Sequence, residues 1–290
     1  MRYPRCAVTS EIFAGEIERD DHLLEIVNRL CGMGYYERIG VGLMYDENIA
    51  RKVRNMTERS GVKLLLWIVH QMNGEGLDIS SPDSSLRTKS LRRVMEFVDM
   101  AAASGADCLG MCSGPNPENN DRKIAFQCLE DSLVQIHERL KQYNMSLLVE
   151  PLDSGAHKNK LLGTTQDTLE LIRVLEGHGI NLDIVWDTAH VALNGDDLFA
   201  SQEKLHEHIS HYHLANAVLD TSSNLFGDWH MPYGKPGFLT TEYANELLRA
   251  FANLPSGHKT YLSVETRPAK GMDVWENERL SRVLMDTIDP

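Results

Sequence analysis

Residues 181–190 read NLDIVWDTAH, a short apolar run that ends at Asp187 and is followed three residues later by His190. An uninterrupted apolar run of this length is typical of a strand in a parallel sheet, which is buried on both faces. Asp187 then has two interpretations. Its side chain either caps the helix that follows or points into a site at the end of the strand. The ten residues alone favour the cap, so the rest of the chain has to decide.

The alternation of a short apolar run with a helical segment repeats along the whole chain. We expect strands at 5–9, 38–44, 63–69, 107–112, 146–150, 182–186, 209–214 and 260–264. Apolar residues at helical spacing lie between them, for example Leu129, Leu133, Ile136 and Leu140. Eight such units predict an α/β fold, a single (β/α)8 TIM barrel over residues 1–290. The alternative is an open doubly wound sheet, but the sequence has no Gly-rich phosphate loop after an early strand.

Composition argues against several classes of protein. The chain has 290 residues and a formal net charge of -13, and this acidic balance counts against nucleic-acid binding. Its five cysteines include no C-x-x-C pair, which indicates neither a disulfide framework nor a structural zinc site. The first residues lack the apolar core of a secretory signal, and no run approaches the ~20 apolar residues of a membrane helix. We therefore expect a cytoplasmic protein.

Four successive expected strands end at a side chain that could bind a metal ion. These side chains are Glu150 in LLVEP, Asp187 in IVWD, His213 in HYHL and Glu265 in LSVET. Taken singly, Glu150 could be a solvated loop acid and His213 an interior histidine. In a barrel, however, the C-terminal ends of the strands gather at one mouth, where burying several carboxylates is costly unless a cation compensates. Three carboxylates and an imidazole suit one divalent ion, with Mn²⁺ favoured and Mg²⁺, Co²⁺ or Zn²⁺ as alternatives.

This combination resembles the xylose-isomerase-like barrel superfamily, and within it the sugar phosphate isomerase/epimerase branch. The resemblance rests on LLVEPLD, WDTAH, HYHLAN, DWHMPYGKPGF and LSVETRP and covers nearly the whole chain. The metal ligands that it implies are Glu150, Asp187, His213 and Glu265. It also implies that His190 contacts a substrate oxygen beside the metal, and His211 has a counterpart in ketose 3-epimerases. Dimers are common in this branch, so a homodimer is one expected assembly.

The resemblance implies a sugar isomerase or ketose 3-epimerase that acts through an enediolate. Glu150 and Glu265 would transfer the proton from the two sides of this flat intermediate, and His190 would stabilise its charge. Ketose 3-epimerases carry a further glutamate after the fifth-strand ligand and an arginine after the seventh-strand histidine, and this sequence has neither. A metal-dependent lyase on the same scaffold is therefore an alternative, such as an inosose or dehydroshikimate dehydratase or the barrel subunit of a C-glycoside deglycosidase.

Further polar residues could face the substrate. They are His70, His157, His211, Asp228 and His230. Asp228 and His230 stand in DWH, which resembles the Asp-x-His of an additional metal site in the endonuclease IV branch. That branch also needs a histidine at the fourth strand, where this chain has Cys112. A DNA-repair enzyme and a non-catalytic metal- or sugar-binding barrel are thus the weaker alternatives. We expect a small sugar or polyol-derived substrate, without phosphate because no phosphate-binding loop is found.

Overall fold

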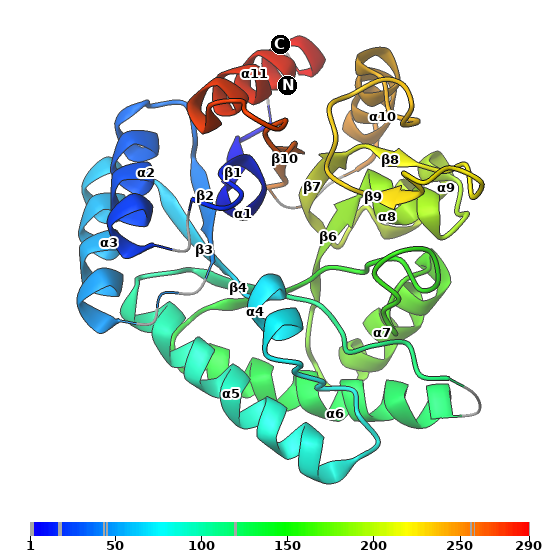
Figure 1. Cartoon of the computed structure of the whole chain (residues 1–290). Coiled ribbons are helices and arrows are strands. Elements are labelled where there is room, and N and C mark those ends of the chain that lie inside the picture. Colours follow the sequence, from blue (N-terminus) through cyan, green and yellow to red (C-terminus); the bar gives the residue numbers. More distant parts are fainter. Residues whose placement is uncertain are drawn as a thin grey trace.

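The computed structural model describes residues 3–16, 19–42, 44, 46–118, 121–255, 257 and 259–289. Eight parallel strands form one sheet in the order β1-β2-β3-β4-β5-β6-β7-β10. Their bounds are β1 (Cys6–Val8), β2 (Arg38–Val41), β3 (Lys63–Trp67), β4 (Cys108–Met111), β5 (Ser146–Val149), β6 (Asp183–Asp187), β7 (Ile209–Ala215) and β10 (Tyr261–Glu265). A parallel bridge between Arg5 and Leu262 joins the first strand to the last. The sheet therefore closes on itself, and the predicted (β/α)8 barrel is confirmed (Figure 1).

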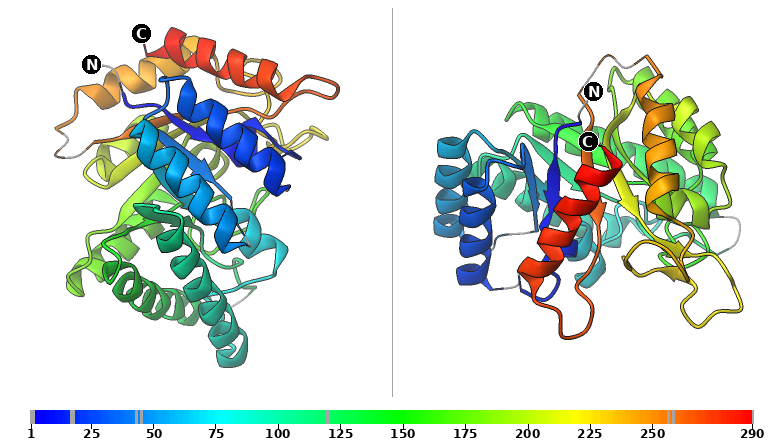
Figure 2. Two further views of the ribbon diagram at one scale, coloured as in Figure 1. Left: turned by 90° about the vertical axis from the view of Figure 1, so that its left-hand side faces the viewer. Right: turned by 90° about the horizontal axis from the view of Figure 1, so that it is seen from above.

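Helices surround the ring of strands (Figures 1 and 2). Their bounds are α1 (Thr9–Ile12), α2 (Asp20–Gly32), α3 (Glu47–Ser60), α4 (Val69–Gly74), α5 (Ser84–Ala103), α6 (Arg122–Lys141), α7 (Thr165–Gly177), α8 (Thr188–Leu193), α9 (Leu198–Leu205), α10 (Thr241–Ala252) and α11 (Val274–Ile288). The short helices α1, α4 and α8 begin at or just after the ends of β1, β3 and β6, so they lie at the mouth of the barrel. A two-stranded antiparallel ribbon, β8 (Ala217–Val218) and β9 (Gly227–Asp228), follows β7.

Local sequence signals set the limits of these elements. Asp83 caps α5 by accepting hydrogen bonds from the backbone N–H groups of Ser85 and Leu86. Gly61 ends α3 with φ of 74°, a left-handed conformation that glycine adopts without steric cost, and β3 begins two residues later. Each of the eight barrel strands begins within one residue of its predicted start.

The strands divide the apolar side chains between two cores. In β6, Ile184 and Trp186 pack in the large core between the barrel and its helices, whereas Val185 packs inside the barrel with Leu65 and Leu148. This follows from the period of two along a strand, which sends successive side chains to opposite faces. The next inward position after Val185 is the last residue of β6, at the barrel mouth.

The two ends of the chain lie side by side next to α11 (Figure 2). The backbone N–H of Tyr3 donates to Asp289 Oδ2 at 2.8 Å, and the buried guanidinium of Arg5 pairs with the same carboxylate. In the part of the chain that the structure describes, no helix is both long enough and apolar enough to cross a bilayer.

Candidate metal centre at the barrel mouth

The inward-facing position at the end of β6 is Asp187. In β7, Tyr212 and Leu214 face the helices, which leaves His213 facing the interior, directly opposite Asp187 in the strand register. Glu150, immediately after β5, and Glu265, at the end of β10, occupy the inward positions on the flanking strands. The alternation along four neighbouring strands thus brings all four predicted ligands to the same end of the barrel.

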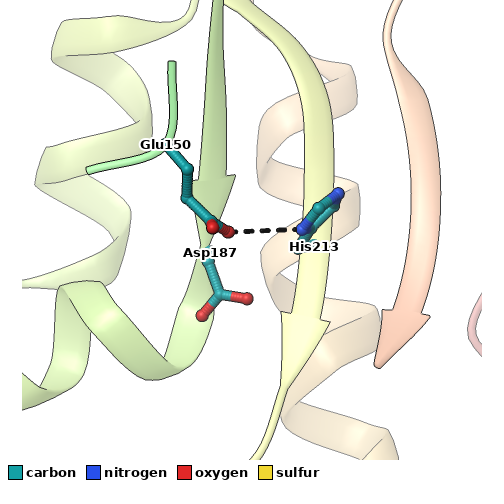
Figure 3. Close-up of side chains that lie close together, drawn as sticks. All are labelled: Glu150, Asp187 and His213. Carbon is teal, nitrogen blue, oxygen red and sulfur yellow. Dashed lines mark ion pairs between the residues drawn. The ribbon is translucent and has the colours of Figure 1, made fainter. Parts of the chain in front are cut away.

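The ligand atoms of this group lie close together. Atoms of Glu150, Asp187 and His213 all lie within 4.8 Å of one another, and Figure 3 shows the Glu150 carboxylate turned towards the His213 ring. His213 Nδ1 is 3.4 Å from Glu150 Oε1 and 2.8 Å from Glu265 Oε1. All four residues are at most 5 % exposed. The structure therefore brings together the residues that the sequence proposed as a metal centre.

Several buried polar atoms of the group have no hydrogen-bond partner among the described residues. These atoms are Asp187 Oδ2 and both ring nitrogens of His213. The short contacts of His213 Nδ1 with Glu150 and Glu265 therefore lack the geometry of hydrogen bonds. Unpartnered buried polar groups are costly and uncommon in native proteins. Atoms that converge on one point without bonding to each other fit a shared cation, and this oxygen-rich set fits a divalent one.

Asp187 combines the two roles that its sequence left open. Its Oδ1 accepts hydrogen bonds from the backbone N–H groups of Ala189, at 2.7 Å, and His190, at 3.1 Å, and so caps α8. Its Oδ2 stays unpartnered on the side of the candidate metal centre. Burial raises the pKa of this carboxyl to about 7, against the opposing effect of His190. One carboxylate thus starts a helix and keeps an oxygen available for a cation.

Charges balance within the centre. Burial acts to lower the pKa of His213, but Glu265 and Glu150 raise it well above its ordinary value. Burial acts to raise the pKa of Glu265, but His213 and His230 hold it well below its ordinary value. Without a cation, a protonated imidazole therefore compensates the carboxylates, and a metal ion would compete with that proton.

His190 lies beside the centre with carboxylates on both ring nitrogens. Its Nδ1 is 3.4 Å from Asp153 Oδ2, and its Nε2 is 3.8 Å from Asp228 Oδ2. Burial acts to lower the pKa of His190, but Asp187, Asp153 and Asp228 raise it to about 9. Asp153 is itself fixed, because its Oδ1 accepts backbone N–H groups from the loop at 156–159. From the sequence we assigned Asp153 no role, although its position three residues after the predicted ligand Glu150 could have marked it as a residue near the site.

Glu11, on α1, is a second residue that the sequence did not single out. Its buried carboxylate contacts His70 Nε2 at 2.9 Å, His230 Nε2 at 3.5 Å and Arg267 Nε at 2.7 Å. His230 Nε2 also lies 3.1 Å from Glu265 Oε2, with hydrogen-bond geometry. Glu11 is therefore linked through His230 to a predicted metal ligand. In the sequence, the feature that could have identified Glu11 is its position as an acid three residues after the first strand.

Asp228 is held by residues of the loop that follows β5. Its backbone N–H donates to His157 Nδ1 at 3.2 Å, and its fully buried Oδ2 lies 3.2 Å from Lys158 Nζ. The ring of His157 packs on Trp229 with 4.6 Å between centroids. Lys158 therefore supplies a positive charge beside Asp228.

Residues 29–281 match the family model described as xylose isomerase-like TIM barrel. The chain belongs to this family. No curated protein matches the sequence. Among solved structures, D-psicose 3-epimerase from Clostridium cellulolyticum H10 is 13% identical, with 100% of this chain and 96% of that chain covered and a TM-score of 0.68. The 3-keto-D-glucoside 4-epimerase YcjR from E. coli is 16% identical (99% and 99% covered, TM-score 0.69), and the IolI protein with a zinc atom is 14% identical (99% and 98%, TM-score 0.72). At these identities the likeness shows the fold alone.

His211 lies apart from the candidate metal centre of this xylose isomerase-like barrel. It pairs in register with Val185, one inward layer below the pair of His213 with Asp187. Its Nε2 contacts Arg38 Nη1 at 3.0 Å and its ring stacks on Tyr261, and these two residues begin β2 and β10. The structure therefore directs His211 to the N-terminal end of the strands, and we leave it out of the proposed site. His70, with its side chain about half exposed, and His157 reach the centre only through Glu11 and Asp228.

Proposed function

We propose that this xylose isomerase-like barrel is a divalent-metal-dependent sugar isomerase or ketose 3-epimerase. The observation that carries the proposal is the cluster of Glu150, Asp187 and His213, whose ligand atoms lie within 4.8 Å of one another, with Glu265 Oε1 at 2.8 Å from His213 Nδ1. Asp187 Oδ2 and both ring nitrogens of His213 are buried there without a hydrogen-bond partner among the described residues. Two of the structurally similar proteins are epimerases that act on sugars, which supports the class of reaction.

The metal would be held by the four side chains at the barrel mouth. Bound there, a divalent ion would polarise the carbonyl of the substrate and offset the negative charge of an enediolate. Mn²⁺ remains our first choice, because three of the four ligands are carboxylates. The zinc atom in the IolI protein makes Zn²⁺ the first alternative to test.

The chain's own residues would move the proton and hold the substrate. Glu150 and Glu265 approach His213 Nδ1 from different strands, and in our proposal one carboxylate takes a proton from carbon and the other returns it. His230 bonds to the second oxygen of Glu265 and would keep this carboxylate oriented. His190, held by Asp153, would donate a hydrogen bond to a substrate oxygen that gains negative charge.

Exchange of carbon-bound protons with solvent tests this proposal. The Mn²⁺-loaded protein is incubated in D₂O with a panel of ketoses, the metal is removed, and deuterium content and products are read by NMR and mass spectrometry. We expect incorporation of one deuterium next to the carbonyl, lost in Glu150→Gln and Glu265→Gln. Glu138→Gln, a change on the exposed face of α6, is the matched control. Equal exchange by all four proteins would rule out the two glutamates as the acid/base pair.

A metal-dependent lyase is the second candidate, favoured by one observation. The sequence lacks the further glutamate and the arginine that ketose 3-epimerases carry near the substrate. Elimination begins with the same removal of a proton, so the exchange experiment would score both reactions. The products separate them, because a lyase product differs in mass by the leaving group whereas an epimer or isomer keeps the molecular formula.

A trinuclear endonuclease site has less support. The position of the fourth-strand histidine that this branch needs is occupied by Cys112. The ammonium of Lys158 already supplies a positive charge beside Asp228, 3.2 Å from its Oδ2. Cleavage of a duplex with an abasic site would be the direct test, and we expect none.

A further inference from the structure

Lys160 is a buried lysine that forms no ion pair with any residue that the structure describes. It is 8% exposed, and its Nζ donates to the neutral side chain of Asn73 at 2.5 Å. Arg5 and Arg38 are the other lysine or arginine residues buried to this degree among the described residues, and each forms an ion pair with an aspartate. Among all the residues that the structure describes, no carboxylate lies within ion-pair distance of Lys160 Nζ.

The backbone holds Lys160 in a fixed place at the barrel mouth. Its N–H donates to the carbonyl of Asp153 at 2.9 Å, and it forms an antiparallel bridge with Pro115 in the loop after β4. Its side chain reaches Asn73 on α4, which follows β3. The residue thus ties together the loops after three neighbouring strands, at the end of the barrel where the metal centre lies.

The backbone of Lys160 pairs with Asp153, in the segment that directly follows Glu150. Cys112 follows β4 directly, and its side chain belongs to the cluster inside the barrel. Burial raises the pKa of this thiol to about 11, and the two charged side chains that act on it are Lys160, which lowers it, and Glu150, which raises it. Lys160 and a predicted metal ligand therefore both act electrostatically on the same interior residue.

Lys158, in the same loop, is a lysine whose charge is balanced by an ion pair. Its Nζ is 3.2 Å from Asp228 Oδ2, so its charge is matched within the protein. Two residues later, Lys160 is more deeply buried, and its one ammonium partner among the described residues is the amide oxygen of Asn73. A buried charge is costly unless it is paired. The missing partner would be supplied by an anionic group that enters the barrel mouth.

We infer that Lys160 forms an anion subsite and that the substrate is an acidic hydroxy-ketone, with a carboxylate or a phosphate bound by its ammonium. This inference rests on the proposed function and names the substrate class of that site. It replaces the sequence-based expectation of a substrate without phosphate, which followed from the missing phosphate-binding loop. A single lysine that is buried by tertiary contacts leaves no such motif in the sequence.

The test compares three substrates of equal carbon number. Deuterium exchange is measured with D-fructose, D-fructose 6-phosphate and D-fructuronate, for the wild type, Lys160→Met and Lys160→Arg. One charge-assisted contact should favour an anionic substrate by about 10- to 100-fold in kcat/KM. Lys160→Met should remove this preference by slowing exchange of the anionic substrates far more than that of D-fructose, whereas Lys160→Arg should keep the preference in large part. The preferred anionic substrate tells phosphate from carboxylate, and Lys89→Met, an exposed change on α5, is the matched control.

A binding experiment separates the subsite from the reaction. Inorganic phosphate and acetate are titrated calorimetrically into metal-free protein, and we expect the wild type and Lys89→Met to bind one of them and Lys160→Met to lose it. If Lys160→Met loses anion binding but the wild type exchanges no substrate, the subsite is supported and the proposed function is overturned. Exchange that is fastest with D-fructose and unchanged in Lys160→Met would overturn the subsite alone. Absence of both exchange and anion binding in the wild type would overturn both.

Discussion

Asp187 Oδ1 accepts the backbone N–H of His190 at 3.1 Å, while Asp187 Oδ2 has no partner among the described residues. The same carboxylate therefore places a candidate metal ligand and a candidate substrate-binding histidine relative to each other. A shift of the start of α8 would move both groups, so the spacing DTAH serves the helix and the site at once.

Replacement of Asp187 by asparagine should separate the two roles. The amide oxygen can still cap α8, so we expect the free energy of unfolding of the metal-free protein to change by less than ~1 kcal/mol. The lost second oxygen should weaken Mn²⁺ binding at least ~10-fold, because a buried charged ligand is gone. Calorimetric titration with Mn²⁺ and urea unfolding in EDTA measure the two effects. Asp187→Ala should in addition lose about 1 kcal/mol from the missing cap.

Metal binding should release a proton from His213. Glu265 and Glu150 outweigh burial and raise the pKa of His213 well above its ordinary value, so the ring is protonated at neutral pH. A metal ligand must be deprotonated, hence affinity should fall as the pH falls, and calorimetry in buffers of different ionisation enthalpy should show about one proton released. Titrations that give the same heat in every buffer would contradict this.

The same raised pKa sets a pH dependence of stability in the metal-free protein. Its contribution is fully present below the unfolded pKa of about 6.5 and is lost as the pH rises through the higher folded pKa. We expect His213→Gln to lower the melting temperature more at pH 6 than at pH 9, measured in EDTA. The reverse order would show that burial, which lowers this pKa, dominates instead.

Glu11 should act on the reaction through His230 and Glu265. Burial acts to lower the pKa of His230, but Glu11 and Asp228 raise it to about 10. With Glu11→Gln we expect deuterium exchange to slow by about 10-fold, because His230 loses the charge that holds it against Glu265. Mn²⁺ affinity should change by less than ~3-fold, since Glu11 is not in the ligand group. A matched loss of affinity and rate would instead make Glu11 part of the metal centre.

Asp153 should matter for both stability and rate, in separable ways. Asp153→Ala removes the acceptor of several backbone N–H groups at 156–159 and should cost about 1–3 kcal/mol of stability in urea unfolding. Asp153→Asn can keep that acceptor but loses the charge facing His190 Nδ1. We expect it to retain most of the stability and to shift the pH profile of exchange, because the pKa of His190 would fall. An unchanged profile would deny Asp153 this positioning role.

His211 should affect the stability of the protein but not the rate of exchange. It contacts Arg38 and Tyr261 at the N-terminal end of the strands. In barrels of this type, residues at that end contribute to stability, whereas the active site lies at the C-terminal end. His211→Gln should therefore lower stability by about 1–3 kcal/mol and leave the rate of exchange unchanged. Loss of exchange in a folded His211→Gln protein would return this histidine to the site.

The fold, and the gathering of the candidate ligands at one end of the barrel, could be predicted because both depend on short-range patterns. An apolar run followed by an acid or a histidine is visible within five residues, as in LLVEP and IVWD. In a closed parallel barrel the alternation of side chains then directs Glu150, Asp187, His213 and Glu265 inward at the same end.

The tertiary structure alone decided which other charged groups meet this centre. Arg267 pairs with Glu11 across 256 residues of sequence, and Lys160 reaches Asn73 across 87. His211 and His213 share one face of one strand, yet the layers of the barrel send them to different partners. Local sequence sets the direction of a side chain along a strand or helix, whereas charge pairing and burial depend on loops that only closure of the barrel brings together.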